Sequence, residues 1–235
     1  MTCGKCESCC NSKFWTFLKS TVGRKFVMGL TGLMLAGFVF THMAGNLIII
    51  FKGADAYNLY GHSITSNPLY PLIGPGLLGI FIIHILTAIS LSLENRKSRA
   101  SKYIAGATNG EKAVPVASRT MVYSGTILLA FLISHLITFK YGTHYSTLVG
   151  DIEVRDLARL FFEVFTSPIY VVGYLISLIA VGLHLKHGFA AAFQSLGFWH
   201  PRYTPVLKCL AALYGIVVAL GFMSQPLYAF FIYKQ

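Results

Sequence analysis

The chain has 235 residues, of which 55% are hydrophobic and only 11% charged, and its mean hydropathy is +0.64. Soluble domains carry roughly 25% charged residues, so this composition excludes an ordinary soluble enzyme and indicates a polytopic membrane protein. The formal net charge of +11 does not indicate nucleic-acid binding, because no basic run carries the interleaved aromatic residues of a reading surface. Basic loops on the cytoplasmic side of a membrane explain the charge better.

Residues 1–25 precede the first long apolar run and form the first of two predicted parts, a cytoplasmic cysteine-containing segment. They lack the short apolar core and cleavage site of a signal peptide. Their cysteines follow a C-x-x-C-x-x-C-C pattern: Cys3, Cys6, Cys9 and Cys10. A reduced tail, a zinc or iron–sulfur site, and lipidation or redox sensing all stay open as interpretations. Residues 14–18 are expected to form a short amphipathic helix on the inner surface.

Residues 26–235 form the second predicted part, an all-α membrane domain with five transmembrane helices. Each apolar run is near the length of about 20 residues that crosses hydrocarbon. The expected spans are Phe26–Phe51, Leu69–Leu93, Thr120–Lys140, Ser167–Leu185 and Pro205–Tyr233. We expect no internal repeat and no low-complexity stretch.

The connections between spans predict the orientation of the bundle. The N-terminal segment and the second and fourth connections are rich in Lys and Arg, whereas the third carries four acidic residues. The positive-inside rule therefore places the N-terminus in the cytoplasm and the C-terminus outside. Within the third connection, Asp151–Phe165 has apolar residues at helical spacing, which predicts an amphipathic helix on the outer surface.

Four of the five spans contain one deeply placed histidine each: His42, His84, His135 and His184. An imidazole in hydrocarbon is costly and points inward to a partner. One histidine per span indicates two pairs of axial ligands for two b haems inside a helix bundle. The alternative is a set of polar hydrogen bonds between helices.

Depth along each span predicts the pairing of these histidines. His42 and His135 lie toward the outer side, and His84 and His184 toward the inner side, so at about 1.5 Å per residue the two levels are roughly 15–20 Å apart. His187, one turn after His184, is the alternative fourth ligand. Gly37 and Gly79, each five residues before a histidine, are candidates for making room for a flat macrocycle.

With these residues in hand, the chain closely resembles the di-haem cytochrome b membrane anchor of succinate:quinone oxidoreductases, the succinate dehydrogenases and fumarate reductases. The resemblance runs from about Gly23 to Gly221. The segments that carry it are GRKFVMGLTGLMLAGFVFTHMAGNL, AYNLYGHSITSNPLY, SRTMVYSGTILLAFLISHLITF and GLHLKHGFAAAFQSLGF. As a set they are specific, although each alone is only an apolar helix with a histidine.

The resemblance implies five helices, two haems held by the four histidines, and exchange of electrons with quinone, usually menaquinone. It also implies a flavoprotein that interconverts succinate and fumarate and an iron–sulfur protein, both docked on the cytoplasmic face. The chain would then lie in the cytoplasmic membrane of a prokaryote, in contact with lipid, and the dicarboxylate site would lie on a partner. Monomeric and dimeric forms of the whole complex are both compatible with the sequence. Some relatives carry a glutamate two residues before the fourth ligand; this chain has Gly182 there, so their proton pathway is not expected.

Within this framework, polar residues near each level are assigned to cofactors. Quinone is expected near the outer haem, with these candidate contacts: Asn46, His62, His144 and Glu163. Haem propionates are expected near these residues: His187, Arg24, Arg119 and Gln194. Two other functions stay open: a cytochrome b subunit of a hydrogenase or formate dehydrogenase, and a metal or haem transporter that uses the cysteine tail.

Overall fold

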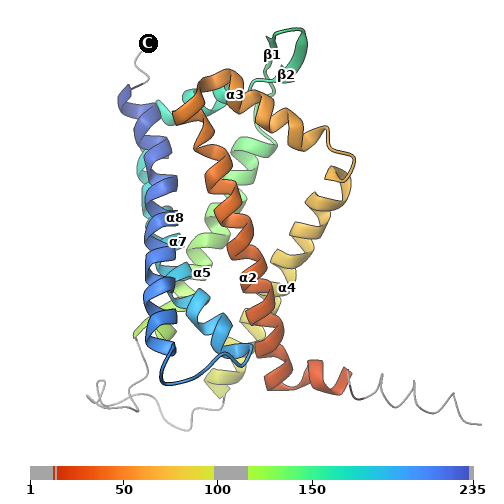
Figure 1. Ribbon diagram of the computed structural model, residues 1–235, viewed down its shortest axis with the longest axis vertical. Helices are drawn as coiled ribbons and strands as arrows, with labels where there is room; N and C mark the ends of the chain where they lie inside the picture. Colours follow the sequence, from red (N-terminus) through yellow and green to blue (C-terminus); the bar gives the residue numbers. More distant parts are fainter. Residues whose placement is uncertain (1–12, 14, 98–115, 233–235) are drawn as a thin grey trace, which may run out of the picture.

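Five long helices dominate the fold in the computed structural model, which describes residues 13, 15–97 and 116–232 (Figure 1). All five are long and apolar enough to cross a membrane, which confirms an all-α membrane protein with five spans. They are α2 (Thr21–Asn46), α4 (Tyr70–Lys97), α5 (Val116–His135) with its π-helical continuation η1 (Leu136–Lys140), α7 (Pro168–Ser195) and α8 (Thr204–Ile232). The four N-terminal cysteines lie outside the described residues.

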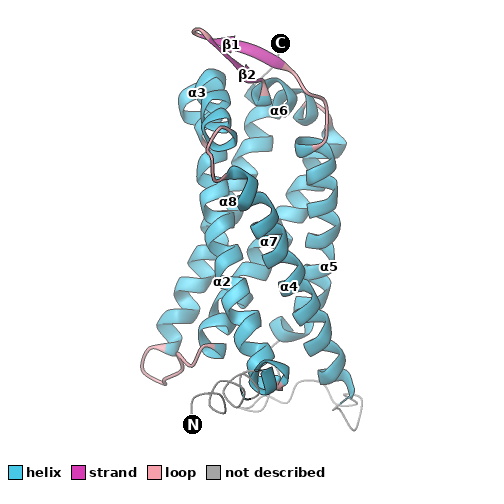
Figure 2. Ribbon diagram, turned by 90° about the vertical axis from the view of Figure 1, so that its right-hand side faces the viewer, coloured by secondary structure: helices cyan, strands magenta, loops and turns pink. Residues whose placement is uncertain are grey.

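The helices α2, α4, α5 and α7 form a bundle, and α8 packs on its outside (Figure 1). α2 packs against α4 and α7, α5 packs against α7, and α8 packs against α7 and α2. One end of the bundle, here called the hairpin end, carries the shorter elements: α3 (Ile48–Thr65), α6 (Leu157–Phe165) and the antiparallel strands β1 (Ser146–Val149) and β2 (Ile152–Arg155) (Figure 2). The opposite end, where α2 begins, is the N-terminal end.

Several span boundaries differ from the sequence-based expectation, and two of them bear on the position of the histidines. The first span was expected to reach Phe51, but α2 ends at Asn46 and the apolar run continues as α3, which lies across the hairpin end. Gly53, at φ +83°, kinks α3 in a conformation that favours glycine. The fourth span was expected to end at Leu185, but α7 runs on to Ser195. His184 therefore lies 11 residues before the end of its helix.

The expected helix Asp151–Phe165 is in fact a strand followed by a shorter helix. Ile152–Arg155 pairs with Ser146–Val149 through a turn at Gly150, whose φ is +63°. The carboxylate of Asp156 then caps α6 by accepting a hydrogen bond of 3.0 Å from the backbone N–H of Arg159. The amphipathic part of the prediction is confirmed, because α6 buries Ala158, Leu160 and three phenylalanines, Phe161, Phe162 and Phe165.

Side-chain packing is concentrated at the hairpin end and around α7 and α8. The main core cluster joins Ile49 of α3, the buried face of α6 and Tyr174 of α7. By contrast, α4 contains no buried residue, because it packs extensively only against α2.

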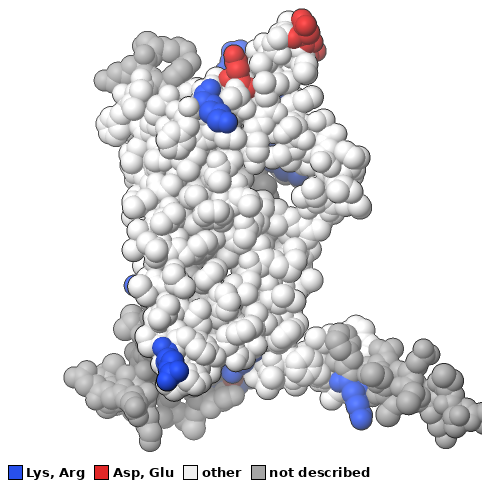
Figure 3. All heavy atoms as spheres, in the orientation of Figure 1, with Lys and Arg blue, Asp and Glu red and all other residues white. Residues whose placement is uncertain are grey.

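Charged side chains gather mainly toward the two ends of the molecule, as the face drawn in Figure 3 shows. In the most apolar 18-residue window of each long helix, no more than two residues are charged. This distribution is what a surrounding hydrocarbon layer requires.

Candidate functional site

His42 and His135 face each other at the hairpin end of the bundle. Their ring centroids are 5.9 Å apart, and the rings are nearly perpendicular at 86°. Phe38 stacks on His42 at 5.4 Å, and Phe131 and Phe139 lie 5.8 and 5.3 Å from His135. The two histidines are thus brought together inside an aromatic enclosure, although α2 and α5 do not pack extensively against each other.

Polar side chains hold both of these imidazoles. The side-chain nitrogen of Asn46 donates to the carbonyl of His42 at 2.7 Å and lies 3.4 Å from each ring nitrogen of His42. Asn46 is in turn held by the phenol of Tyr57, which donates to its Oδ1 at 2.7 Å. Burial, reinforced by Tyr60, raises the pKa of Tyr57 to about 12, so this phenol keeps its proton. On the other side, the hydroxyl of Tyr174 lies 3.2 Å from Nδ1 of His135.

The other two histidines of the spans are His84 on α4 and His184 on α7. Nδ1 of His84 lies 3.2 Å from the hydroxyl of Thr31, and Nδ1 of His184 lies 3.0 Å from the hydroxyl of Ser124. Each hydroxyl comes from a neighbouring helix, α2 for Thr31 and α5 for Ser124. Sequence reasoning missed both hydroxyl partners.

Glycines beside these two hydroxyls leave room for the imidazoles. A methyl group added at Gly32 would lie 3.4 Å from Cε1 of His84, and one added at Gly125 would lie 3.6 Å from Cε1 of His184. Gly37 and Gly79, the glycines expected to make room for a flat macrocycle, have no neighbouring atoms within 4 Å of an added methyl group, so the space beside them is open. Gly32 and Gly125 instead lie next to histidine rings.

These contacts fix the separation between the two histidine pairs. Thr31 is level with His84 and precedes His42 on α2 by 11 residues; Ser124 is level with His184 and precedes His135 on α5 by 11 residues. At about 1.5 Å per residue, each helix places the two pairs about 16 Å apart along its axis. The agreement between two independent helices defines two levels in the bundle.

The equal spacing reflects a short internal repeat, which we did not expect from the sequence. Both helices follow the pattern [TS]-G-x5-F-x2-[TS]-H, from Thr31 to His42 in α2 and from Ser124 to His135 in α5. Phe38 and Phe131 are the repeated phenylalanines beside the two histidines. Aligning the residues before each histidine would have revealed the hydroxyl, the glycine and the phenylalanine together.

Arg24 lies below the His84 level, about 10 Å nearer the N-terminal end by the seven residues that separate it from Thr31. It forms an ion pair with Glu94 and donates to the hydroxyl of Ser90 at 2.7 Å. Among the described side chains, Nε of Arg24 and Oε2 of Glu94 are buried without a hydrogen-bond partner. The cluster therefore retains an unused buried donor of the kind that an anionic group would satisfy.

The other residues expected near propionates are less closely grouped. His187 is partly exposed one turn after His184, and Gln194 is exposed near the end of α7. The side chain of Arg119 lies outside the described part of the chain. Of these four residues, Arg24 is the one observed with a buried donor that has no hydrogen-bond partner, a feature that it shares with Arg155 of β2.

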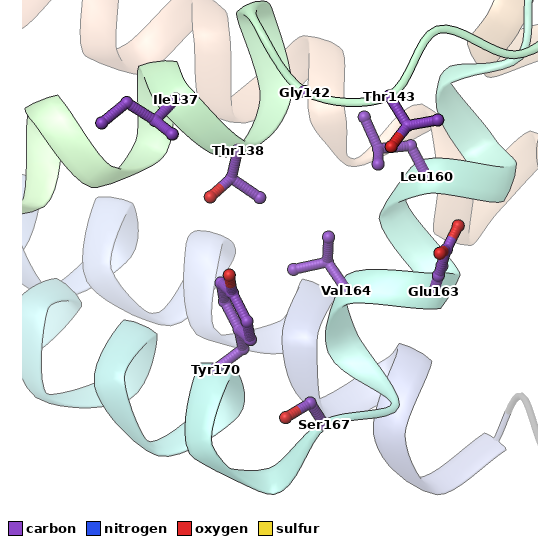
Figure 4. Close-up of a pocket in the computed structure, with 9 residues that line it drawn as sticks. All are labelled: Ile137, Thr138, Gly142, Thr143, Leu160, Glu163, Val164, Ser167 and Tyr170. Carbon is purple, nitrogen blue, oxygen red and sulfur yellow. The ribbon is translucent and has the colours of Figure 1, made fainter.

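A cavity of about 370 Å³ opens at the hairpin end, immediately after His135 in the chain (Figure 4). Ile137, Thr138 and Gly142 border it on one side, and α6 and the start of α7 border it on the other. Glu163 lines this cavity and forms a hydrogen bond with Tyr145, which raises the pKa of the Tyr145 phenol. Of the four expected quinone contacts, Glu163 lies at the cavity and Asn46 beside His42, whereas His62 and His144 line neither.

The spacing of His42 and His135 fits the axial positions of a haem. Two imidazoles on opposite sides of one metal ion have centroids roughly 6 Å apart, because each metal–nitrogen bond is about 2 Å long. The separation of 5.9 Å between His42 and His135 meets this requirement. Within the described ranges no group of three or more His, Cys, Asp or Glu is placed to hold a bare metal ion.

Comparison of the chain with known protein families, curated proteins and solved structures found no match.

Proposed function

We propose that the protein is a di-haem cytochrome b that anchors a succinate:quinone oxidoreductase in the membrane. In this role it exchanges electrons between a quinone, expected to be menaquinone, and an iron–sulfur partner. The observation that carries the proposal is the facing pair His42 and His135 on two helices that do not pack extensively against each other. His84 and His184 support a second haem, because each contacts a hydroxyl at a level about 16 Å from the first pair.

Bound haem would supply a one-electron couple at each level. The chain's own residues contribute ligation, orientation and the exclusion of water. His42 and His135 would hold one haem among Phe38, Phe131 and Phe139, whose rings keep the site apolar. His84 and His184 would hold the other, and the unused Nε of Arg24 would donate to a propionate of this second haem.

The hairpin end is proposed as the outer side, where quinone reacts. Three features support this assignment: the acidic character of the connection between α5 and α7, the cavity beside His135, and the carboxylate of Glu163 in its wall. Electrons that enter at the opposite end reach the His84 level first. An outer haem then has a role only if a redox partner such as quinone exchanges electrons with it at the hairpin end. Glu163 is proposed to accept a proton from the quinol.

The N-terminal end is proposed as the cytoplasmic side, which docks the iron–sulfur and flavoprotein subunits. Its connections carry most of the chain's Lys and Arg, which supports this orientation by the positive-inside rule. The dicarboxylate site would then lie entirely on the flavoprotein.

Reduction by succinate tests this assignment in the complex purified from its native membrane. Adding succinate without oxygen is expected to reduce the b haems chemically, which is measured as the appearance of the ferrous b-type spectrum. A flavin-bearing subunit is expected to co-purify with the chain. Reduction by hydrogen or formate instead, together with a nickel- or molybdenum-containing partner, would assign the chain to another quinone-linked complex. Substoichiometric and exchangeable metal in place of haem would indicate a transporter.

A further inference from the structure

The two histidines of the inner pair share a feature that the proposed function does not explain. Each places Nδ1 within hydrogen-bond distance of an aliphatic hydroxyl on another helix, Thr31 for His84 and Ser124 for His184. Thr31 is buried, with 7% of its surface exposed, and Ser124 is partly buried. The outer pair has no equivalent among the described contacts, since Tyr174 and Asn46 take this place there.

The direction of these hydrogen bonds follows from the other contacts of each hydroxyl. A hydroxyl has one proton to donate and two lone pairs to accept. The hydroxyl of Thr31 donates its proton to the carbonyl of Val27 at 2.8 Å, and that of Ser124 donates to the carbonyl of Met121 at 3.1 Å. With the proton used, each oxygen can only accept from the imidazole. Nδ1 of each histidine then carries the proton, and Nε2 keeps its lone pair.

We propose that Thr31 and Ser124 are positioning residues that hold His84 and His184 as Nε2 ligands of the inner haem. The proposal rests on the proposed function, because it assigns the iron of that haem as the partner of both Nε2 atoms. An acceptor on Nδ1–H fixes the tautomer and ring orientation of a ligating histidine and raises its basicity. The internal repeat places both hydroxyls at one depth, so the two ligands of one haem receive the same support from opposite sides.

Removing an acceptor should weaken its histidine as a ligand and favour ferrous over ferric iron. Thr31→Val and Ser124→Ala are therefore expected to raise the midpoint potential of the inner haem. A tenfold change in the redox equilibrium, at the lower limit of outer-shell effects, corresponds to about 59 mV for a one-electron couple. The potential of the outer haem should stay unchanged in both variants.

The chain offers matched controls for both substitutions. Thr87 on α4 donates only to its own helix, to the carbonyl of Ile83 at 2.6 Å, and Thr126 on α5 donates to the carbonyl of Val122 at 2.9 Å. Thr87→Val and Thr126→Val should leave both potentials unchanged. Thr31→Ser and Ser124→Thr keep the hydroxyl and should keep the wild-type potential, which separates a lost hydrogen bond from altered packing.

The experiment is a potentiometric titration of the purified complex, followed by optical and electron paramagnetic resonance spectra of each haem. The proposal is supported if Thr31→Val and Ser124→Ala shift the midpoint potential, or remove the signal, of only the haem that His84→Ala removes. Thr31→Ser and Ser124→Thr should then behave like the wild type. Unchanged potentials, equal shifts of both haems, or failure of Thr31→Ser would overturn it while leaving the di-haem assignment intact. A wild-type chain without haem would instead overturn the proposed function itself.

Discussion

The imidazoles of His42 and His135 meet edge to face with centroids 5.9 Å apart, although α2 and α5 do not pack extensively against each other. The same two helices also carry Thr31 and Ser124, which contact the histidines of the second pair. α2 and α5 therefore define both levels of the bundle, one through their own histidines and the other through hydroxyls that hold histidines of α4 and α7.

The four single histidine-to-alanine variants should fall into two pairs, and both members of a pair should lose the same haem. His42→Ala and His135→Ala are expected to delete one spectral component, and His84→Ala and His184→Ala the other, because each haem needs both axial ligands at one depth. Potentiometric titration of the four variants measures this, with His62→Ala as a control that should retain both components. If His42→Ala and His184→Ala delete the same component, the pairing proposed here is wrong.

Glu163→Gln should slow electron exchange with quinone and leave both haem spectra unchanged. The amide keeps the shape of the side chain but cannot accept a proton from quinol, and general acid–base groups typically contribute roughly 10²–10⁴-fold to a rate. Stopped-flow reduction of the haems by a menaquinol analogue measures the effect. Glu153→Gln, on strand β2 and outside the cavity, is the matched control. Equal rates in both variants would move quinone chemistry away from this cavity.

Tyr57→Phe should perturb the His42 side of the outer site. Removing the hydroxyl leaves Oδ1 of the partly buried Asn46 without its phenol donor, so the expected cost is about 1 kcal/mol, the lower end of the range for a buried acceptor. Thermal unfolding should show lower stability, and a redox titration should show a shift in the midpoint potential of the outer haem alone. Tyr60→Phe is the control, because Tyr60 does not hydrogen bond to Asn46 in the described contacts. A shift confined to the inner haem would contradict the placement of Asn46.

The same phenol predicts a dependence of stability on alkaline pH. Burial raises the pKa of Tyr57 from 10.0 to about 12, so the folded protein retains this proton more tightly than the unfolded chain. The resulting stabilisation is complete below pH 10 and is lost as the pH rises toward about 12. Denaturation measured across this range should show a smaller decline for Tyr57→Phe than for the wild type. Equal declines would show that Tyr57 does not titrate in this way.

Gly182→Leu should separate α7 from α8 and destabilise the protein. A methyl group at Gly182 would already lie 2.9 Å from Cβ of Ala219 and 3.1 Å from the carbonyl oxygen of Gly215, so a larger side chain cannot fit without helix movement. Gly173→Leu, on the same helix but with no atoms within 4 Å, is the control. Equal thermal stability of the two variants would contradict this packing. The close approach also explains why α7 has no room for a glutamate here.

The five spans were predictable because hydrocarbon imposes one length and one composition on every crossing helix. The end of α2 was not, because the run Leu47–Phe51 is as apolar as the helix before it and only tertiary packing turns it into α3. The strand Ile152–Arg155 was also missed, because it directly precedes the helical pattern of α6 and was included in the same predicted helix. Packing of distant residues decides the first case, whereas pairing within a short local hairpin decides the second.

The four histidines were predictable as a set because each is an exception to the composition of its span. Their hydrogen-bond partners were harder to identify, because Thr and Ser are common in membrane helices and usually bond to their own backbone, as Thr87 and Thr126 do. What distinguishes Thr31 and Ser124 is contact across helices, together with their equal distance from His42 and His135. The repeat was present in the sequence, but its significance depends on that contact.

The most direct test of the central claim is the haem content and spin state of the purified protein. The pyridine haemochrome assay combined with electron paramagnetic resonance should give two b haems per chain, both low-spin, because two imidazoles saturate each iron. A redox titration of the same sample should resolve two one-electron components. One haem per chain, a high-spin signal in intact protein, or no haem at all would contradict the account.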